Sequence, residues 1–552
     1  MNDEEKLNMT ERKLLNISRR CSLVEYSQRK IVKNLDFYQE HEQHGRKLKS
    51  LPVCLRDRLL RELTSLKFDG GFWDSIQNFE RKLKDFSFLL SFETKEIELD
   101  GLMSFCPEEI IYQQLTRVVQ MIAADAPNVQ SLMINGRNFM RKKHLYRTLD
   151  RASIEAICSL SKLKKLKISM SLRVEFCDLM KICETLQFLE YVDITIDDEL
   201  LEFSADKFKR SFSRLKVFLF SGRSIELCRK LIRFCIQHLP KVRLLNYLDF
   251  TLEPVDFDKL KLPPGTSSLM NLCVYPTTLP IHQHFPEVRR LAIGLPQSWD
   301  SSEHNIDTLL HCSKLESIYF EFSFSSENIF IRLLDHYGLH LRRLHIANYN
   351  FKFRMGDIMN RCKGLEKLIF HGRPIISDQP SKQTQTYFAE LKELTWKIPI
   401  LRNGNHGEHL LHLLSSPKLE KVTLSLNEED DLDVLKEISN LIANGQILRE
   451  LKSLKILFNP YLRHEAGDIP PLFKALNSLT KNACAFLPKC TRIIVKPIGS
   501  HSLLAPFYDS QGEFEGFRLP TCSRTEIFYN FREFGQHNLA KFLFACRAGR
   551  RL

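Results

Sequence analysis

The sequence predicts an α/β fold built from repeated strand–helix units, for three reasons. A six-residue pattern, apolar-x-x-apolar-x-apolar, recurs fourteen times between residues 129 and 495. The intervening segments, such as "RVVQMIAADAP" and "HLLHLLSSP", carry apolar residues three and four positions apart, which is typical of amphipathic helices. The composition, 43% hydrophobic and 27% charged over 552 residues, is that of a folded protein too long for one compact core.

The hexads recur at similar intervals. Most successive copies begin 24 to 28 residues apart, with one interval of 19 and longer intervals of 32 to 39 towards the two ends. A period in the twenties built on L-x-x-L-x-L is typical of leucine-rich repeats, in which strands line a concave side and helices cover a convex side. Since no unit can bury its apolar face alone, residues 102–497 are predicted to form a solenoid. The copies begin at Val129, Leu163, Leu189, Leu215, Val242, Leu269, Val288, Leu315, Leu341, Leu365, Leu391, Leu419, Leu451 and Cys490.

Three further segments flank the predicted solenoid. Residues 1–65 are expected to form a helical docking region, and residues 66–101 a connecting or N-terminal capping region. Residues 498–552 are expected to form a C-terminal cap, because "TEIFYNFREFGQHNLAKFLFACRAGRRL" has the apolar spacing of helices.

The segment "SLVEYSQRKI" (22–31) predicts a short amphipathic helix. Ser22 and Glu25 form a capping box, which starts a helix at Leu23. Leu23, Ser27 and Ile31 recur every four residues and drift by about 40° per step, so they form one stripe with a small residue at its centre. Such a stripe favours close contact with a partner while Leu23 enters a pocket.

The segment "LPVCLRDRLL" (51–60) predicts a second helix. Pro52 suits the first helical position, where the missing N–H is not needed. The apolar face is expected to consist of Leu55, Leu59, Leu60 and Leu63, and the solvent face of Arg56, Asp57 and Arg58.

The first of these helices resembles the BC-box of Elongin B/C-binding proteins. That motif reads Ser/Thr-Leu-x-x-x-Cys/Ser/Ala-x-x-x-aliphatic, and Ser22, Leu23, Ser27 and Ile31 occupy its four positions. The resemblance implies that these four residues bind the Elongin B/C adaptor.

The second helix resembles the cullin box that follows a BC-box. Leu51, Pro52, Leu55 and Leu59 match its pattern and are implied to bind a cullin. Cys54 stands where the box that selects the fifth cullin has a second Pro, so the resemblance favours the VHL-type box that selects the second cullin. A BC-box, a cullin box and degenerate leucine-rich repeats, in that order, are also seen in ZYG-like and PRAME-like substrate receptors.

The resemblance implies a non-catalytic substrate receptor of a cullin-RING ubiquitin ligase, and other interpretations stay open. A segment beginning L-P also resembles the start of an F-box, which would bind the Skp adaptor, although Trp73 does not complete that pattern. Both helices could instead cap the apolar end of the solenoid, as terminal repeats require. The chain would then be an interaction scaffold without a ligase role.

Basic residues predominate on the strand face that points away from the predicted core. Acidic residues there are few, mainly Asp193, Glu321 and Glu393. The face is expected either to bind a protein substrate of acidic character or to be an ordinary solvated surface. The net charge of +13, spread over 552 residues, does not by itself predict a nucleic-acid partner. The candidate substrate-binding residues are Lys165, Lys167, Arg290, Arg343, His345, Lys367, His371, Lys397 and Lys421.

The sequence contains no motif of a known catalytic or cofactor site. It has no phosphate-binding loop, dinucleotide fingerprint or nucleophile elbow, so neither catalysis nor a cofactor is expected. His406, His409 and His412 lack the H-E-x-x-H pattern and are expected to lie on a convex helix rather than to bind a metal. Fifteen cysteines without a C-x-x-C, and no long apolar segment, favour a cytoplasmic or nuclear protein that does not cross a membrane.

Overall fold

The computed structural model of the chain describes residues 23–65, 76–107, 109–135, 147–169, 172–197, 204–222, 225–245, 264–274, 280–294, 306–321, 327–376, 388–397, 406–426, 431–458, 471–497 and 526–529. These residues form two compact units, which we call unit 1 (residues up to Met270) and unit 2 (residues from Asn271). Both units combine helices with parallel sheets, which confirms the predicted α/β class. The division falls inside the range 102–497 that was predicted as one solenoid.

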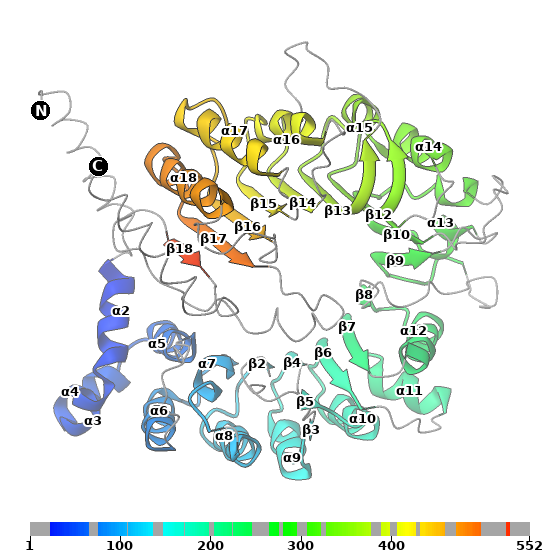
Figure 1. Ribbon diagram of the computed structural model, residues 1–552. Helices are drawn as coiled ribbons and strands as arrows, with labels where there is room; N and C mark the ends of the chain where they lie inside the picture. Colours follow the sequence, from blue (N-terminus) through cyan, green and yellow to red (C-terminus); the bar gives the residue numbers. More distant parts are fainter. Residues whose placement is uncertain are drawn as a thin grey trace, which may run out of the picture. The chain divides into compact units, whose positions relative to one another are not determined.

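Unit 1 contains a parallel sheet in the order β1-β2-β4-β6-β7-β8, with a small parallel pair, β3 and β5, beside it. Within this unit, Figure 1 shows the helices lying along one side of the sheet. The strands are β1 (Glu96–Glu98), β2 (Ser131–Asn135), β3 (Arg147–Thr148), β4 (Lys165–Ser169), β5 (Leu172–Arg173), β6 (Tyr191–Ile196), β7 (Val217–Gly222) and β8 (Leu244–Leu245). The helices that accompany them are α7 (Asp100–Met103), α8 (Ile111–Asp125), α9 (Arg151–Ser159), α10 (Phe176–Thr185), α11 (Ala205–Phe212) and α12 (Ile225–His238).

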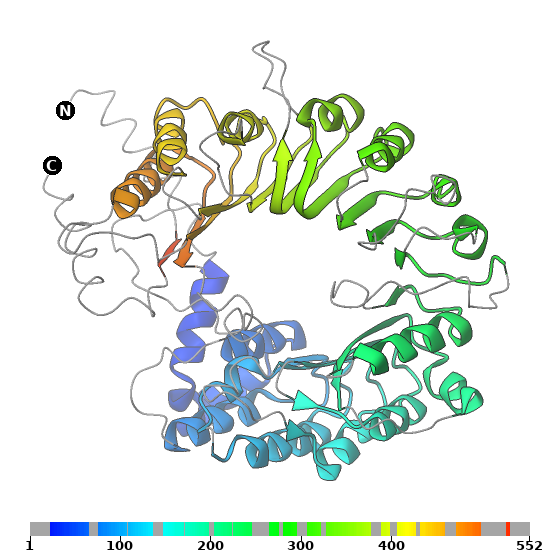
Figure 2. The same ribbon diagram turned by 45° about the vertical axis from the view of Figure 1, so that its right-hand side comes forward.

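Unit 2 contains a longer parallel sheet, in which every strand pairs with its neighbours in chain order from β9 to β18. Figure 2 shows its helices gathered on one side of this sheet. The strands are β9 (Asn271–Val274), β10 (Arg290–Gly294), β11 (Ser317–Glu321), β12 (Arg343–Phe353), β13 (Lys367–Ile376), β14 (Glu393–Lys397), β15 (Lys421–Leu426), β16 (Ser453–Phe458), β17 (Arg492–Pro497) and β18 (Glu526–Tyr529). The helices are α13 (Ile281–His284), the short 3-10 helix η4 (Asp307–Leu309), α14 (Glu327–Tyr337), α15 (Met355–Arg361), α16 (His406–Leu414), α17 (Asp431–Ala443) and α18 (Pro471–Phe486).

All fourteen predicted hexads contain a strand, and each strand begins at the third residue of its hexad. The register pairs equal hexad positions, as in Lys165 with Tyr191 and Lys367 with Glu393. Side chains at one hexad position therefore form a row across the sheet. We call the face formed by positions three and five of the hexad, together with the residue that follows the hexad (position seven), the strand face.

The core lies on the other side of each sheet, where hexad positions one, four and six are buried. In the hexad that contains the start of β13, for example, Leu365, Leu368 and Phe370 are fully buried. This alternation follows from the two-residue period of a strand. None of the helices in the ranges given above is long and apolar enough to cross a lipid bilayer.

The N-terminal part of unit 1 is helical, as predicted, but it contains more helices than the two motifs. It comprises α2 (Leu23–Lys33), α3 (Leu35–Glu40), α4 (Glu42–Lys49), α5 (Val53–Ser65) and α6 (Ile76–Leu89). Helix α2 packs against α5, with Val32 buried and Arg29 bound to Glu62 of α5 at 3.3 Å. A hydrogen bond joins α3 to α6: the side-chain amide of Gln39 donates to the carboxylate of buried Asp85 at 2.8 Å.

Asp57 corrects one expectation for α5, because it is buried instead of facing solvent. Helix α5 also packs against α7 and β1, so the side of the helix that carries Asp57 is covered. Burial raises the pKa of the Asp57 carboxyl, although Arg61 and the backbone N–H of Lys95 oppose the shift.

Candidate functional site

The stripe predicted to bind an adaptor lies on α2. Ser22 is outside the described residues, as is the side chain of Leu23, while the backbone of α2 begins at Leu23. Ser27 is exposed and Ile31 is half-buried. Ser27 lies about 140° around the helix from buried Val32, because five residues turn an α-helix by about 500°. The centre of the stripe therefore faces away from α5.

The residues predicted to bind a cullin divide into two groups. Pro52 is exposed and directly precedes α5, where its carbonyl accepts the amides of Leu55 at 2.9 Å and Arg56 at 3.2 Å. Leu51 and Leu55 are half-buried. Leu59 is only 1% exposed and packs in the core of unit 1, so it supports the fold and offers no surface to a partner.

The two candidate lysines of unit 1 have partners on the neighbouring strand. The Nζ of Lys165 lies over the ring of Tyr191, 4.8 Å from its centroid. The Nζ of Lys167 pairs with the Oδ2 of Asp193 at 2.8 Å. Both contacts join β4 to β6, so these lysines stabilise the sheet laterally and are not free cations.

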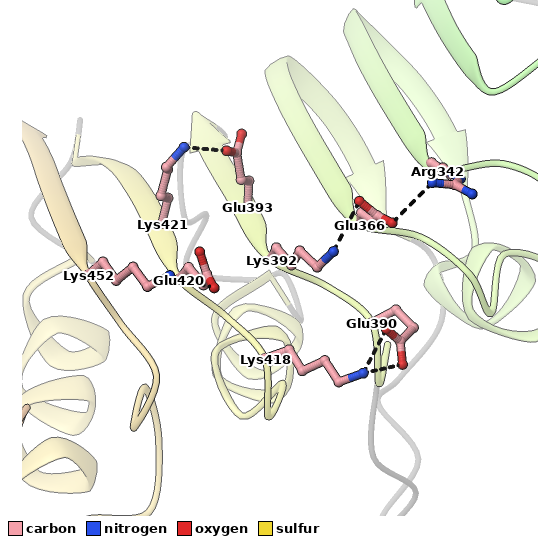
Figure 3. Close-up of polar contacts among 9 residues, drawn as sticks. All are labelled: Arg342, Glu366, Glu390, Lys392, Glu393, Lys418, Glu420, Lys421 and Lys452. Atoms are coloured by element: carbon pink, nitrogen blue, oxygen red, sulfur yellow. Dashed lines mark hydrogen bonds and ion pairs between the residues drawn. The ribbon is translucent and has the colours of Figure 1, made fainter. Parts of the chain in front are cut away.

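Glu393 on β14 neutralises much of the strand face of unit 2. It accepts from Lys367 of β13 at 2.8 Å and from Lys421 of β15 at 2.7 Å. Figure 3 shows Glu393 directed towards Lys421. Burial opposes ionisation of Glu393, but the hydrogen bonds from the two lysines outweigh it and lower the pKa of this carboxyl to about 2.

The two candidate histidines of unit 2 are neutral near pH 7. Burial, together with nearby His371, Lys397 and Lys367, lowers the pKa of His345 to about 3. Burial and Lys397 also lower the pKa of His371. His345 packs edge-on against Tyr319 of β11, with ring centroids 4.2 Å apart. These imidazoles therefore add aromatic surface and no positive charge to the strand face.

Among the candidate residues of unit 2, three cations have no carboxylate partner in the described part of the chain. They are Arg290 on β10, Arg343 on β12 and Lys397 on β14. Both arginines are exposed, and Lys397 is half-buried. The basic surface predicted from sequence is thus reduced to a few positions in unit 2.

A ladder of ion pairs at the second hexad position was not predicted. From Arg289 to Lys452 this position alternates in sign along consecutive repeats, and four pairs of opposite charges on neighbouring repeats are in contact, several of them drawn in Figure 3. The pairs are Arg289–Glu316 at 3.4 Å, Arg342–Glu366 at 3.7 Å, Glu366–Lys392 at 3.3 Å and Glu420–Lys452 at 2.8 Å. Glu390 and Lys418, two residues before the ladder position of their repeats, add a parallel contact at 2.6 Å.

Glu366→Ala tests whether this ladder stabilises the sheet. Glu366 contacts both Arg342 and Lys392, so its removal is expected to lower the free energy of unfolding by about 1 kcal/mol at low ionic strength. In 1 M NaCl, where the screening length is about 3 Å, the difference should largely disappear. Urea titrations at both ionic strengths measure it. Glu437→Ala on α17, an exposed glutamate without a described partner, is the matched control and should have no comparable effect.

The lowered pKa of Glu393 predicts a pH-dependent contribution to stability. A carboxyl whose pKa is lower in the folded state stabilises the fold fully above its ordinary value of 4.5. This contribution is lost as the pH falls from 4.5 to about 2. The difference in unfolding free energy between wild type and Glu393→Gln should therefore be constant at neutral pH and shrink on acidification. A difference that grows below pH 4.5 would contradict the assignment.

The histidines of α16 are mostly interior residues. His406 is 2% exposed, and its Nε2 accepts the backbone N–H of Ile376 at 3.3 Å. His409 is also buried, so these two side chains belong to the interior of unit 2. Among the described residues, one cluster has the spacing of metal ligands, namely Glu175, Cys177 and Asp178, and none of the three is buried.

Comparison with known proteins does not place the chain in a family. No protein-family model matches the sequence, and no curated protein is significantly similar to it. The arrangement of residues alone is therefore the basis for a functional proposal.

Proposed function

We propose that this chain is a leucine-rich-repeat substrate receptor of a cullin-RING ubiquitin ligase and is not itself catalytic. The observation that carries the proposal is the stripe on α2. Its central small residue, Ser27, is exposed on a helix that α5 holds from the other side. A helix fixed in this way can enter a partner's groove with little further loss of conformational entropy.

The repeats support a solenoid that presents a substrate-binding surface. Fourteen hexads form parallel strands in constant register, and helices gather on one side of each sheet. Rows of equivalent side chains on the strand face then form an extended surface, which is how repeat proteins bind other proteins. In this proposal the N-terminal helices bind Elongin B/C and a cullin, and the strand face holds a protein substrate for ubiquitin transfer by other subunits.

Affinity purification with quantitative mass spectrometry tests the proposal. Tagged full-length chain is expected to recover Elongin B and C together with a cullin. The double variant Leu23→Ala/Ile31→Ala should reduce the recovery of Elongin at least about tenfold, because buried apolar anchors dominate such contacts. The matched control is Phe92→Ala, which removes a 65% exposed aromatic side chain of unit 1 that is not part of α2 and should leave recovery unchanged.

The other outcomes separate the competing interpretations. Recovery of the Skp adaptor in place of Elongin would support the F-box interpretation. Recovery of neither adaptor would contradict the ligase proposal and leave an interaction scaffold. Circular dichroism of the purified variants shows whether a loss of Elongin reflects a loss of folding.

A further inference from the structure

Two arginines of unit 2 differ from their immediate neighbours in the chain. Arg289 and Arg342 belong to the ion-pair ladder and contact Glu316 and Glu366. The next residues, Arg290 and Arg343, begin strands β10 and β12, are exposed, and have no carboxylate within ion-pairing distance in the described part of the chain. In these two repeats, the arginine at the second hexad position is therefore neutralised by a glutamate, whereas the arginine at the third position keeps its charge.

The register places the two arginines at equivalent positions with one strand between them. Arg290 pairs with Ser317 of β11, and Ser317 pairs with Arg343 of β12. Neighbouring strands lie about 4.8 Å apart, so the two arginine Cα atoms are about 10 Å apart. Ser317, which lies between them, is too small to obstruct a ligand that contacts both guanidinium groups.

The surface beside the arginines is uncharged and partly aromatic. The fifth position of the same strands carries Ala292, Tyr319 and His345, with the rings of Tyr319 and His345 in contact. Over the whole strand face of β10–β15, five cationic side chains oppose two carboxylates. Positive charge next to apolar and aromatic surface suits a peptide better than a phosphate backbone, which would need a continuous cationic track.

We propose that Arg290 and Arg343 bind two carboxylates about 10 Å apart in an extended acidic segment of a partner protein. Three residues of a polyproline-II-type segment span about 9.3 Å and return side chains to the same side, so an acidic-x-x-acidic segment matches the two arginines. Arginine suits this task because its planar guanidinium binds a carboxylate through two parallel hydrogen bonds. This inference rests on the proposed function in one respect: the proposed function identifies the acidic segment as part of the ligase substrate.

Fluorescence polarisation with the purified full chain tests the proposal. The probes are labelled twelve-residue peptides of constant Pro/Ser background that carry two glutamates one to six positions apart, and a peptide with one glutamate. Affinity is expected to be highest at a spacing of three, at least about fivefold above the single-glutamate peptide. Arg290→Ala/Arg343→Ala should reduce the binding of the best peptide to the single-glutamate level.

The control variant is Arg289→Ala/Arg342→Ala, which removes the same charge from the neighbouring ladder and should change peptide affinity less than about twofold. Affinity that does not depend on glutamate spacing, or an equal loss in both double variants, would overturn the proposal. Tighter binding of a single-stranded oligonucleotide, lost in Arg290→Ala/Arg343→Ala and falling steeply with salt, would also overturn it in favour of nucleic acid. The peptide assay contains no ligase subunit. Peptide binding can therefore be absent while Elongin is recovered, and peptide binding can be present while Elongin is not recovered.

Discussion

Trp396→Ala is expected to lower the free energy of unfolding of unit 2 by about 3–5 kcal/mol, the usual cost of truncating a buried tryptophan. Trp396 is 1% exposed and meets Phe370 edge-on, with ring centroids 5.3 Å apart. Phe370 stacks on Phe353 at 5.7 Å, and Phe353 contacts Phe330 of α14 at 6.2 Å. Removal of the indole would leave a cavity at the end of this row of rings, on the core side of the sheet.

Urea unfolding followed by near-ultraviolet circular dichroism measures this effect. Phe486→Ala is the control, because this aromatic side chain of α18 is 51% exposed and should cost less than about 0.5 kcal/mol. Trp396→Phe should cost much less than Trp396→Ala, since the buried indole Nε1 has no hydrogen-bond partner among the described residues and its removal leaves no acceptor unsatisfied. If Trp396→Ala lowers the free energy of unfolding by less than about 1 kcal/mol, this row of rings does not stabilise unit 2 as expected.

Ser27→Arg is expected to weaken binding of the Elongin B/C adaptor by about 2–4 kcal/mol, which is roughly 30- to 1,000-fold. The proposed docking requires a small residue at the centre of the α2 stripe, so that the helix can lie close to its partner. An arginine at this exposed position would hold Ile31 away from the adaptor without disturbing the contact between α2 and α5. Isothermal titration calorimetry with purified Elongin B/C measures the affinity.

Ser161→Arg is the matched control for this substitution. Ser161 is exposed in the turn before β4, in the same unit but away from α2. The control variant is expected to bind the adaptor like wild type. Equal affinity of wild type and Ser27→Arg would mean that the stripe is not the docking surface.

The apolar periodicity of the hexads predicted the strands well because it reflects a local requirement. Positions one, four and six must be buried wherever a strand covers the core, and every one of these positions that the structure describes is buried. Strand β1 escaped prediction because Thr94, not an apolar residue, occupies the first position of its hexad, where it is buried. Strand β18 lies in the tail that was expected to be helical, and Arg524 stands at the corresponding first position.

The charge of the strand face could not be predicted from one strand at a time. Whether Lys367 is a free cation depends on Glu393, 26 positions later in the chain, and on a register that brings the two side chains together. The alternation from Arg289 through Glu316, Arg342 and Glu366 is visible once the hexads are aligned, so this signal was available in the sequence. The burial of Asp57 and Leu59 was not visible there, because it depends on how α5 packs against α7 and β1.

Hydrogen–deuterium exchange of the full chain, with and without purified Elongin B/C, tests the central claim most directly. If α2 is the docking helix, the amides of Leu23–Lys33 should exchange more slowly when the adaptor is bound, while those of β12 and β13 in unit 2 should not change. A helix that only caps unit 1 would exchange at the same rate in both samples. Unchanged exchange in α2 at saturating adaptor would contradict the account.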